Sequence, residues 1–210
     1  MKRIELIENY LDELFQDPKC ELNYSKDYEL LISVMLSAQT TDKRVNDVTS
    51  VLWNRYNSLE DLKNADLNDL KNILRPLGNF NKKALFTKEI ATMIVDKYNG
   101  VMPRTRKKLE SLPGVGRKTV NVVFAELNIE PQIAVDTHVE RVSKRLDMAK
   151  SEDDVLEIER RLRKIIKRIN WSKRHLQLVL FGRYYCKAIN PMCNECKLKE
   201  ICKYNKTTRK

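Results

Sequence analysis

Four cysteines near the end of the printed sequence have the residue type and spacing of a metal centre. They follow the pattern Cys186-x6-Cys193-x2-Cys196-x5-Cys202, so four thiols lie within 17 consecutive residues (202 − 186 + 1). Zinc ribbons usually supply their ligands as two short pairs on separate turns, whereas here one pair lies between two longer gaps. Iron–sulfur cubanes bind sets of four cysteines at varied spacings. We therefore predict a [4Fe-4S] cluster, with structural zinc or a pair of disulfides as the alternatives.

Disulfides are disfavoured because the sequence predicts a reducing compartment. The first residues include a basic pair but no apolar run, so no signal peptide is expected. No segment approaches the roughly 20 apolar residues of a membrane span. Clustered thiols in a cytoplasm act as ligands rather than bridges. We expect a cytoplasmic protein, associated with the nucleoid if it is prokaryotic, in which the fifth cysteine, Cys20, only packs.

The composition predicts a basic, mostly helical protein. Its 210 residues include only five glycines and six prolines, and little of the sequence has the pattern of a sheet. The 40 lysines and arginines exceed the 29 aspartates and glutamates, which gives a formal net charge of +11. This charge suits an anionic partner such as nucleic acid, but many basic proteins bind none. The charge is therefore informative only when a site accompanies it.

Apolar residues recurring at helical spacing predict the helices that would position such a site. Asp17-Pro18 is expected to end the first helix, Asp42 to cap the third, and Asn99-Gly100 to stop a later one. The expected helices cover residues 4–15, 28–37, 42–53, 67–74, 82–98 and 104–111, then a helix that starts at 117 or 118, one through 139–146 and one within 151–168.

The run Leu112-Pro-Gly-Val-Gly-Arg-Lys118 predicts a helix–hairpin–helix. Its two glycines allow backbone dihedrals and close approaches that a Cβ atom would obstruct. The backbone amides of the hairpin and of the next helical turn would then point outward, where a phosphate can accept hydrogen bonds from them. An ordinary tight turn between two helices is the alternative, but the full run in a basic protein favours phosphate binding.

Lys118 and Asp136 are the candidate catalytic residues. Lys118 starts a predicted helix beside Arg117, and both the helix dipole and the neighbouring charge disfavour its ammonium form. A free amine at this position could act as a nucleophile, although most such lysines are solvated or contact phosphate. Asp136 follows the apolar residues 133–135 and could simply cap the next helix.

Together these features resemble the endonuclease III family of DNA glycosylases, within the helix–hairpin–helix superfamily. The resemblance includes the hairpin run, the Val-Asp-Thr-His segment whose aspartate lies 18 positions after the lysine (136 − 118), and the spacing of the four cysteines. The segment Leu36-Ser-Ala-Gln-Thr-Thr-Asp42 also looks like the family. The similarity covers almost the whole chain, from about residue 30 to residue 202.

The resemblance implies an all-α, two-lobed helix–hairpin–helix DNA glycosylase fold. A six-helix lobe would comprise residues 23–133, with the helix–hairpin–helix at about 104–125. Residues 1–22 and 134–210 would form a [4Fe-4S] cluster lobe, with the cluster loop at 186–202. Double-stranded DNA carrying a damaged base or an abasic site would lie in the cleft, with Lys118 and Asp136 facing each other across it. We expect a monomer.

The resemblance also implies a bifunctional glycosylase and AP lyase of base excision repair. The damaged pyrimidine would be flipped out of the duplex. Lys118 would attack the sugar C1′ atom and form a Schiff base, from which β-elimination nicks the strand. Asp136 would deprotonate Lys118 or stabilise positive charge on the sugar. The cysteines expected to bind the cluster are Cys186, Cys193, Cys196 and Cys202, whose role would be structural.

Seven residues are expected to contact DNA. Gln39 is similar to a family glutamine that fills the gap left by the flipped base. Where bacterial members often read Gly-Leu-Tyr-Asn, this chain has Gly78-Asn-Phe-Asn81, so the apolar wedge becomes polar and lesion preference is expected to change. The expected contacts are Gln39, Asn79, Leu112, Gly114, Val115, Gly116 and Thr119.

Two alternative functions stay open at this stage. Adenine glycosylases carry a small residue in place of Lys118 and a glutamate in place of Ala38, so that activity is not expected, and 8-oxoguanine glycosylases lack the cysteines. A mismatch-specific thymine or uracil glycosylase and a catalytically silent iron–sulfur DNA-binding module both fit the same motifs.

Overall fold

The computed structural model describes residues 2–208 and contains helices but no strand within that range, which confirms the predicted all-α class. The chain divides into two compact units, described separately below. The hairpin unit comprises residues 20–123, and the cluster-loop unit comprises residues 1–19 and 124–210. These boundaries lie at 19/20 and 123/124, whereas the lobes inferred from the resemblance end at 22/23 and 133/134. Within residues 2–208, no helix is both long and apolar enough to cross a membrane.

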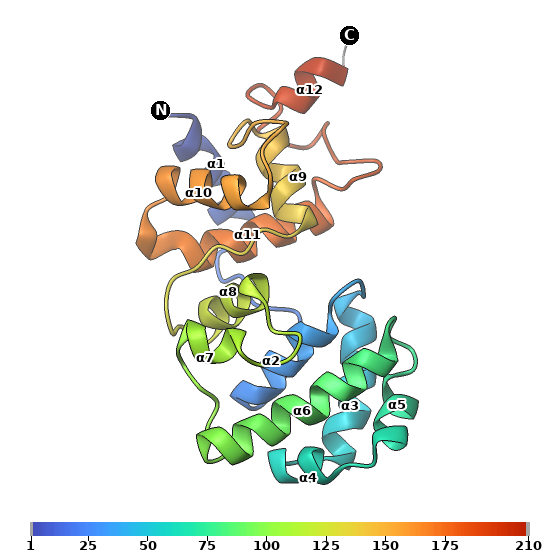
Figure 1. The fold of residues 1–210 in the computed structure, drawn as a ribbon. Coiled ribbons are helices and arrows are strands. Elements are labelled where there is room, and N and C mark those ends of the chain that lie inside the picture. Colours follow the sequence, from blue (N-terminus) through green and yellow to red (C-terminus); the bar gives the residue numbers. More distant parts are fainter. Residues whose placement is uncertain (1, 209–210) are drawn as a thin grey trace. The chain divides into compact units, whose positions relative to one another are not determined.

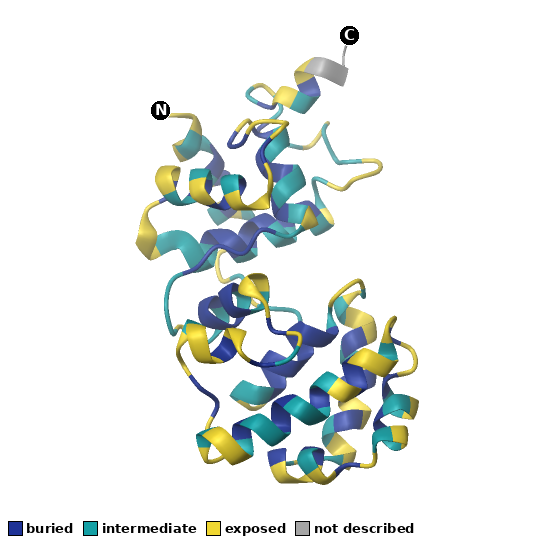
Figure 2. Ribbon diagram, in the orientation of Figure 1, coloured by how far each residue is buried: buried dark blue, intermediate teal, exposed yellow. Residues whose placement is uncertain are grey.

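The hairpin unit is built around one almost fully buried helix (Figures 1 and 2). This helix is α2, in which every residue from Glu29 to Leu36 is buried. The long helix α6 packs against α2, α4 and α5, and α3 packs against α2 and α5. The helices of this unit are α2 (Asp27–Leu36), α3 (Asp42–Arg55), α4 (Leu59–Asn64), α5 (Leu67–Leu74), α6 (Phe80–Tyr98), α7 (Arg106–Glu110) and the first part of α8 (Arg117–Glu126).

Side-chain caps set several helix starts in this unit. Thr41, not Asp42, caps α3: its hydroxyl accepts a hydrogen bond from the Arg44 amide, and Asp42 is the first helical residue. The prediction that Asp42 is the cap was therefore wrong by one position, since the residue with extended dihedrals is Thr41. The stop of α6 is as predicted, because Asn99 adopts left-handed dihedrals with φ 52° and Gly100 follows with φ 74°.

The cluster-loop unit packs α11 against α1 and α9. Its core contains Ile7 and Leu11 from α1, Val139 and Val142 from α9, and Phe181 from α11. The C-terminal segment joins the same core through Leu198 and Cys202. The helices are α1 (Arg3–Leu14), the rest of α8, α9 (Thr137–Arg145), α10 (Val155–Ile165), the 3-10 helix η1 (Arg168–Asn170), α11 (Trp171–Tyr184) and α12 (Lys203–Thr208).

A largely buried polar network ties α1 to α11. Arg174 donates two hydrogen bonds to the Asp12 carboxylate at 2.7 and 2.8 Å and one to Glu8 at 3.1 Å. Gln177, fully buried, donates to the backbone oxygens of Leu11 at 3.2 Å and Phe15 at 2.7 Å. These bonds satisfy the polar groups that α11 buries, and they hold the first helix against a helix more than 150 residues later in the chain.

The close contact between α9 and α11 depends on one glycine. A Cβ atom added to Gly182 would lie 2.8 Å from the Cβ atom of His138 and 3.3 Å from its Cα atom. The Gly182 carbonyl also accepts a hydrogen bond from Arg141 at 2.7 Å. The two helices can therefore approach this closely only because residue 182 has no side chain.

Candidate functional site

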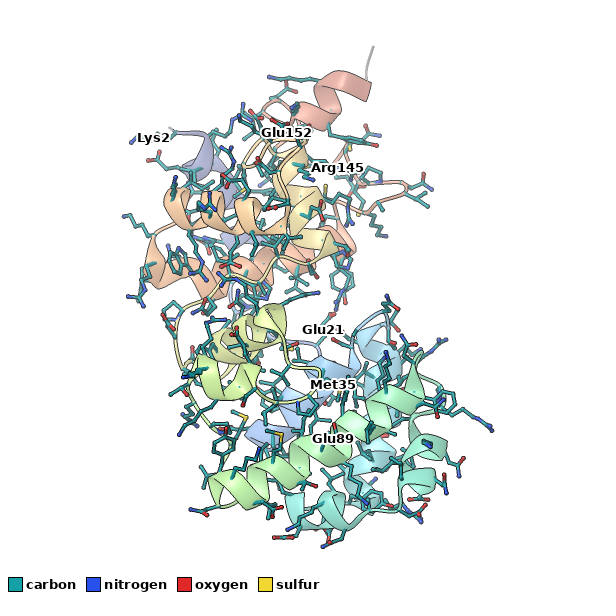
Figure 3. The ribbon with its side chains drawn as sticks, viewed as in Figure 1. Lys2, Glu21, Met35, Glu89, Arg145 and Glu152 are labelled. Carbon is teal, nitrogen blue, oxygen red and sulfur yellow. The ribbon has the colours of Figure 1, made fainter. Side chains whose placement is uncertain are left out.

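The predicted hairpin connects α7 to α8, and its first glycine is required by both conformation and packing. Gly114 has φ +71°, in the left-handed region that side chains disfavour. A Cβ atom at this position would lie 2.6 Å from the Phe86 ring and 3.2 Å from Cγ of Met35, which is labelled in Figure 3. The turn therefore packs directly against α2 and α6 at residue 114.

The second glycine has a different role, because a Cβ atom added to Gly116 would meet no protein atom within 4 Å. Within residues 2–208, the backbone N–H groups of Gly116, Lys118 and Thr119 donate to no acceptor outside α8. The first amides of a helix need partners, and an anion can supply them. The turn thus has open space at Gly116 and amides without a backbone acceptor, which are the donors that phosphate binding requires.

The remaining hairpin side chains anchor the turn. Leu112 and Val115 are buried, at 2% and 4% exposure, so their side chains belong to the core and only their backbones are available to a ligand. Arg106 on α7 donates a 2.7 Å hydrogen bond to the buried Asn121 on α8, which fixes the two helices to each other. The predicted helix–hairpin–helix is present, and Thr119 is half-buried in the first turn of α8.

Lys118 is exposed and is the second residue of α8, so it lies in the same first helical turn as the amides described above. It belongs to the hairpin unit, whereas Asp136 belongs to the cluster-loop unit. Asp136 is the N-cap of α9: its Oδ1 atom accepts hydrogen bonds from the amides of His138 at 2.9 Å and Val139 at 2.8 Å. Within the described residues, its other oxygen, Oδ2, accepts no hydrogen bond. One oxygen therefore serves the helix, and the second is available for chemistry.

Gln39 and Asn79 are both exposed in the hairpin unit and share an unusual backbone conformation. Gln39 has φ 57° in the turn after α2, and Asn79 has φ 56° immediately before α6. Asparagine often caps helices, but the Asn79 side chain makes no capping hydrogen bond. The amide side chains at both positions are therefore open to a partner.

The four clustered cysteines line a single cavity in the cluster-loop unit. Leu146, Phe181 and Tyr185 form part of its wall. None of the four forms a disulfide; Cys202 is buried and the other three are half-buried. Among residues 2–208, no three His, Cys, Asp or Glu side chains form a group suited to one metal ion. Four thiols around one apolar cavity match the donor set of a multi-iron cluster, so the residues present fit the predicted group.

Arg145, labelled in Figure 3, is the last residue of α9 and contacts the first cysteine of the cluster loop. Its guanidinium donates to the Cys186 sulfur at 3.4 Å and to the Lys187 carbonyl at 2.7 Å, and it stacks over the Tyr204 ring at 4.0 Å. Burial raises the pKa of the Cys186 thiol, and Arg145 partly opposes this shift. Burial also raises the pKa of Cys196. Since a metal binds the thiolate, a bound cluster would have to displace the protons that burial favours.

The comparisons with known proteins agree with this fold and site. A family model described as "HhH-GPD superfamily base excision DNA repair protein" matches residues 32–168. The chain is 43% identical over 203 residues to endonuclease III of Bacillus subtilis, covering 97% of this chain and 93% of that protein. It is 40% identical to endonuclease III of Haemophilus influenzae, over 97% of this chain and 95% of that protein.

Solved structures show the same similarity. A non-covalent endonuclease III–DNA complex matches with a TM-score of 0.94 and 43% identity, and a trapped endonuclease III–DNA covalent intermediate with 0.93 and 42%. Both matches cover 100% of each chain. A thermostable thymine-DNA glycosylase matches with a TM-score of 0.84 at 22% identity, over 98% of this chain and 97% of that one, which shows a shared fold only.

The all-helical fold with its helix–hairpin–helix therefore defines a base excision DNA repair protein of the HhH-GPD superfamily. Within that superfamily, the chain belongs to the endonuclease III family. The family resemblance found in the sequence is thus confirmed, and so is the class of enzyme that it implied.

Proposed function

We propose that this protein is a bifunctional DNA glycosylase and AP lyase that removes oxidised or otherwise damaged pyrimidines from duplex DNA. The observation that carries the proposal is Lys118, an exposed amine one residue into α8, beside backbone amides open to phosphate. Those amides would hold the DNA backbone, and the lysine would act on the sugar attached to it. The trapped covalent complex formed by a relative that is 42% identical supports a covalent mechanism.

The reaction would begin with a nucleotide flipped out of the stack, because the glycosidic bond is inaccessible inside the duplex. The neutral Lys118 amine forms a bond to C1′ as the C1′–N bond breaks, and the base leaves with the bonding pair and takes up a proton. Loss of the amine proton and opening of the sugar ring give a Schiff base. Removal of a C2′ proton then expels the 3′ phosphate, and water releases Lys118.

Asp136 would assist this sequence with its Oδ2 atom, either by taking the proton from Lys118 or by stabilising positive charge on the sugar. Its Oδ1 atom is already held by the α9 amides of His138 and Val139, which would fix the orientation of the carboxylate. Gln39 would fill the gap left by the flipped base, and Asn79 would take the wedge position. Leu112, Gly114, Val115, Gly116 and Thr119 would contribute mainly backbone contacts.

We further propose that Cys186, Cys193, Cys196 and Cys202 bind a [4Fe-4S] cluster. With all four ligands from cysteine, the cluster would have no position open for substrate and would serve to order the loop 186–202. Lysines along this loop, such as Lys187 and Lys199, would face the DNA backbone. The functional lobes are proposed as 23–133 and 1–22 plus 134–210, in a cytoplasmic monomer that associates with the nucleoid if the organism is prokaryotic.

Borohydride trapping tests the proposal directly. With duplex DNA that contains an abasic site or thymine glycol, the wild-type protein should form a covalent adduct, and Lys118→Ala should form none. Lys107→Ala removes an exposed lysine of the hairpin unit and serves as the matched control, which should still be trapped. If cluster-loaded wild-type protein gave no adduct with either DNA, a silent DNA-binding module would replace the proposal.

A panel of duplexes defines the substrate. Thymine glycol and 5-hydroxycytosine should be excised faster than uracil or thymine opposite guanine. The reverse order of excision rates would identify a mismatch glycosylase. Borohydride trapping that depends on Lys118 would still demonstrate lyase activity in that case. Affinity for any of these duplexes should fall with salt, with a log–log slope of about −0.9 per phosphate neutralised.

A further inference from the structure

Lys83 on α6 joins the two turns that carry Gln39 and Asn79. Its side chain is 5% exposed, and its Nζ atom donates to the Ala38 carbonyl at 3.0 Å and to the Thr40 hydroxyl at 3.2 Å. These acceptors are the residues on either side of Gln39. The backbone N–H of Lys83 donates to the carbonyl of Asn79, the N-cap of α6, at 3.1 Å, which is the first regular backbone bond of that helix. A single residue thus contacts both turns, although they lie about 40 positions apart in the chain.

The burial of Lys83 is costly for stability. Burying an ammonium group requires compensating partners, and burial lowers the pKa of Lys83. Among the residues that the structure describes, no carboxylate forms an ion pair with this lysine. Its compensation comes from two neutral oxygens, both on the Gln39 turn. An apolar side chain would fill the same space at lower cost, so the lysine points to a role in conformation rather than in stability.

The two turns need to be held in place. Both Gln39 and Asn79 lie in the left-handed region, at φ 57° and 56°. A non-glycine residue in that region costs on the order of 1 kcal/mol and persists where neighbouring contacts fix it. Such conformations are common where a side chain must be presented to a ligand. The Lys83 side chain bonds the residues on either side of Gln39 and so ties that turn to α6, the helix that begins directly after Asn79.

The same segment of α6 also supports the hairpin. Phe86, three residues after Lys83, is the side chain against which Gly114 packs. The first two turns of α6 therefore contact all three segments: the Gln39 turn, the Asn79 turn and the hairpin proposed to bind phosphate. All of these contacts lie inside the hairpin unit.

We propose that Lys83 is a positioning residue that sets the spacing between Gln39 and Asn79, and thereby aligns the two side chains that enter the DNA. The proposal rests on the proposed function, because it takes Gln39 and Asn79 to be DNA contacts. Lys83 itself is buried and would not contact the substrate. Its removal should weaken recognition of the gapped duplex and leave the chemistry at Lys118 unaltered.

The test measures affinity for a duplex that contains the uncleavable abasic analogue tetrahydrofuran, in a double-mutant cycle. Lys83→Met keeps the length of the side chain and removes its hydrogen bonds. Because bonds to a charged donor contribute strongly, we expect about tenfold weaker binding in the wild-type background. In the Gln39→Ala background the same change should have less than about a twofold effect, since coupled residues are not additive.

Two further variants separate positioning from folding. Lys88→Met removes a similar bond from the same helix, in which Lys88 donates to the Ala65 carbonyl at 2.6 Å, away from either turn. It should leave the affinity unchanged. Thr40→Val keeps Lys83 itself and removes one of the two acceptors of its Nζ atom, and it should weaken binding about threefold even if Lys83→Met fails to fold.

Additive effects of Lys83→Met and Gln39→Ala, or an equal loss with Lys88→Met, would overturn the proposal. If Lys83→Met does not fold, the proposal would be overturned by a Thr40→Val variant that binds the analogue as tightly as the wild-type protein does. Failure of the proposed function is a separate result: wild-type protein would bind the analogue but would not be trapped on an abasic site by borohydride. Coupling between Lys83 and Gln39 would still be measurable in that case, because the affinity assay requires no catalysis.

Discussion

The hairpin at 111–116 and the loop at 186–202 are both irregular segments proposed to face DNA, but they are held in opposite ways. The hairpin is fixed by its own apolar packing: Leu112 and Val115 are buried, and Gly114 rests on Phe86. The loop has one buried cysteine, three half-buried ones and an arginine that bonds its carbonyls. A short turn can be ordered by protein contacts alone, whereas in the loop of 17 residues (202 − 186 + 1) only Leu198 and Cys202 are buried, so we propose that a ligand orders it.

Loss of a cysteine ligand should have the largest effect of these changes. The effect should be confined to the cluster-loop unit. Cys202→Ser removes the buried ligand, so the cluster should be lost and the cluster-loop unit destabilised by several kcal/mol, on the order of a structural metal site. Visible absorption and iron content report the cluster, and hydrogen exchange reports each unit. Cys20→Ser is the control and should retain the cluster. If the hairpin lost as much protection from hydrogen exchange as the loop, the two segments would not be held in different ways.

The two hairpin glycines should respond differently to alanine. Gly114→Ala places a Cβ atom against Phe86 at a positive φ, so it should destabilise the hairpin unit by about 1–3 kcal/mol. Gly116→Ala meets no protein atom and should change stability by less than about 0.5 kcal/mol, yet weaken DNA binding. Urea unfolding and DNA titration measure the two effects. Unchanged affinity in Gly116→Ala would show that DNA does not approach this glycine.

Gly182→Ala tests whether close packing is equally sensitive in the other unit. The added Cβ atom would lie 2.8 Å from the Cβ atom of His138, so α9 and α11 must separate, at a cost of about 1–3 kcal/mol. Because α9 carries Arg145, the cluster should also be lost more quickly on mild heating. Thermal unfolding monitored by visible absorption provides the measurement. A cluster as durable as that of the wild type would show that the loop is independent of the α9–α11 contact.

Acidic pH should lower the stability of the cluster-loop unit, by less than the substitutions above. Hydrogen bonds from Arg174 hold the pKa of Asp12 well below its usual range. The stabilisation is therefore fully present above the unfolded pKa of about 4, and is lost as the pH falls toward the lower folded value. Since the Asp12 side chain is 38% exposed, solvent screening limits the effect to about 1 kcal/mol. Asp12→Asn should flatten the dependence of unfolding free energy on pH, and an unchanged profile would exclude this carboxylate as its source.

Local patterns predicted most of the helices correctly. The range predicted as 67–74 is α5 itself, and the predicted stop at Asn99-Gly100 is observed. The prediction missed α4, α11 and α12. The helix α11 buries Arg174, His175 and Gln177 among its apolar residues, so its sequence lacks a purely apolar face. The six residues of α4 are too short for a periodic pattern to stand out.

The sequence by itself determined the groups that we propose to react or bind: the four spaced cysteines, the glycine hairpin, Lys118 and Asp136. These features depend on residue type and on short distances along the chain, which backbone geometry fixes locally. Only the tertiary structure decided which groups support them. The bond from Lys83 to Ala38 spans 45 residues, and the bond from Arg145 to Cys186 spans 41. Such contacts depend on which helix faces pack together, because that packing alone brings residues distant in sequence within hydrogen-bond distance.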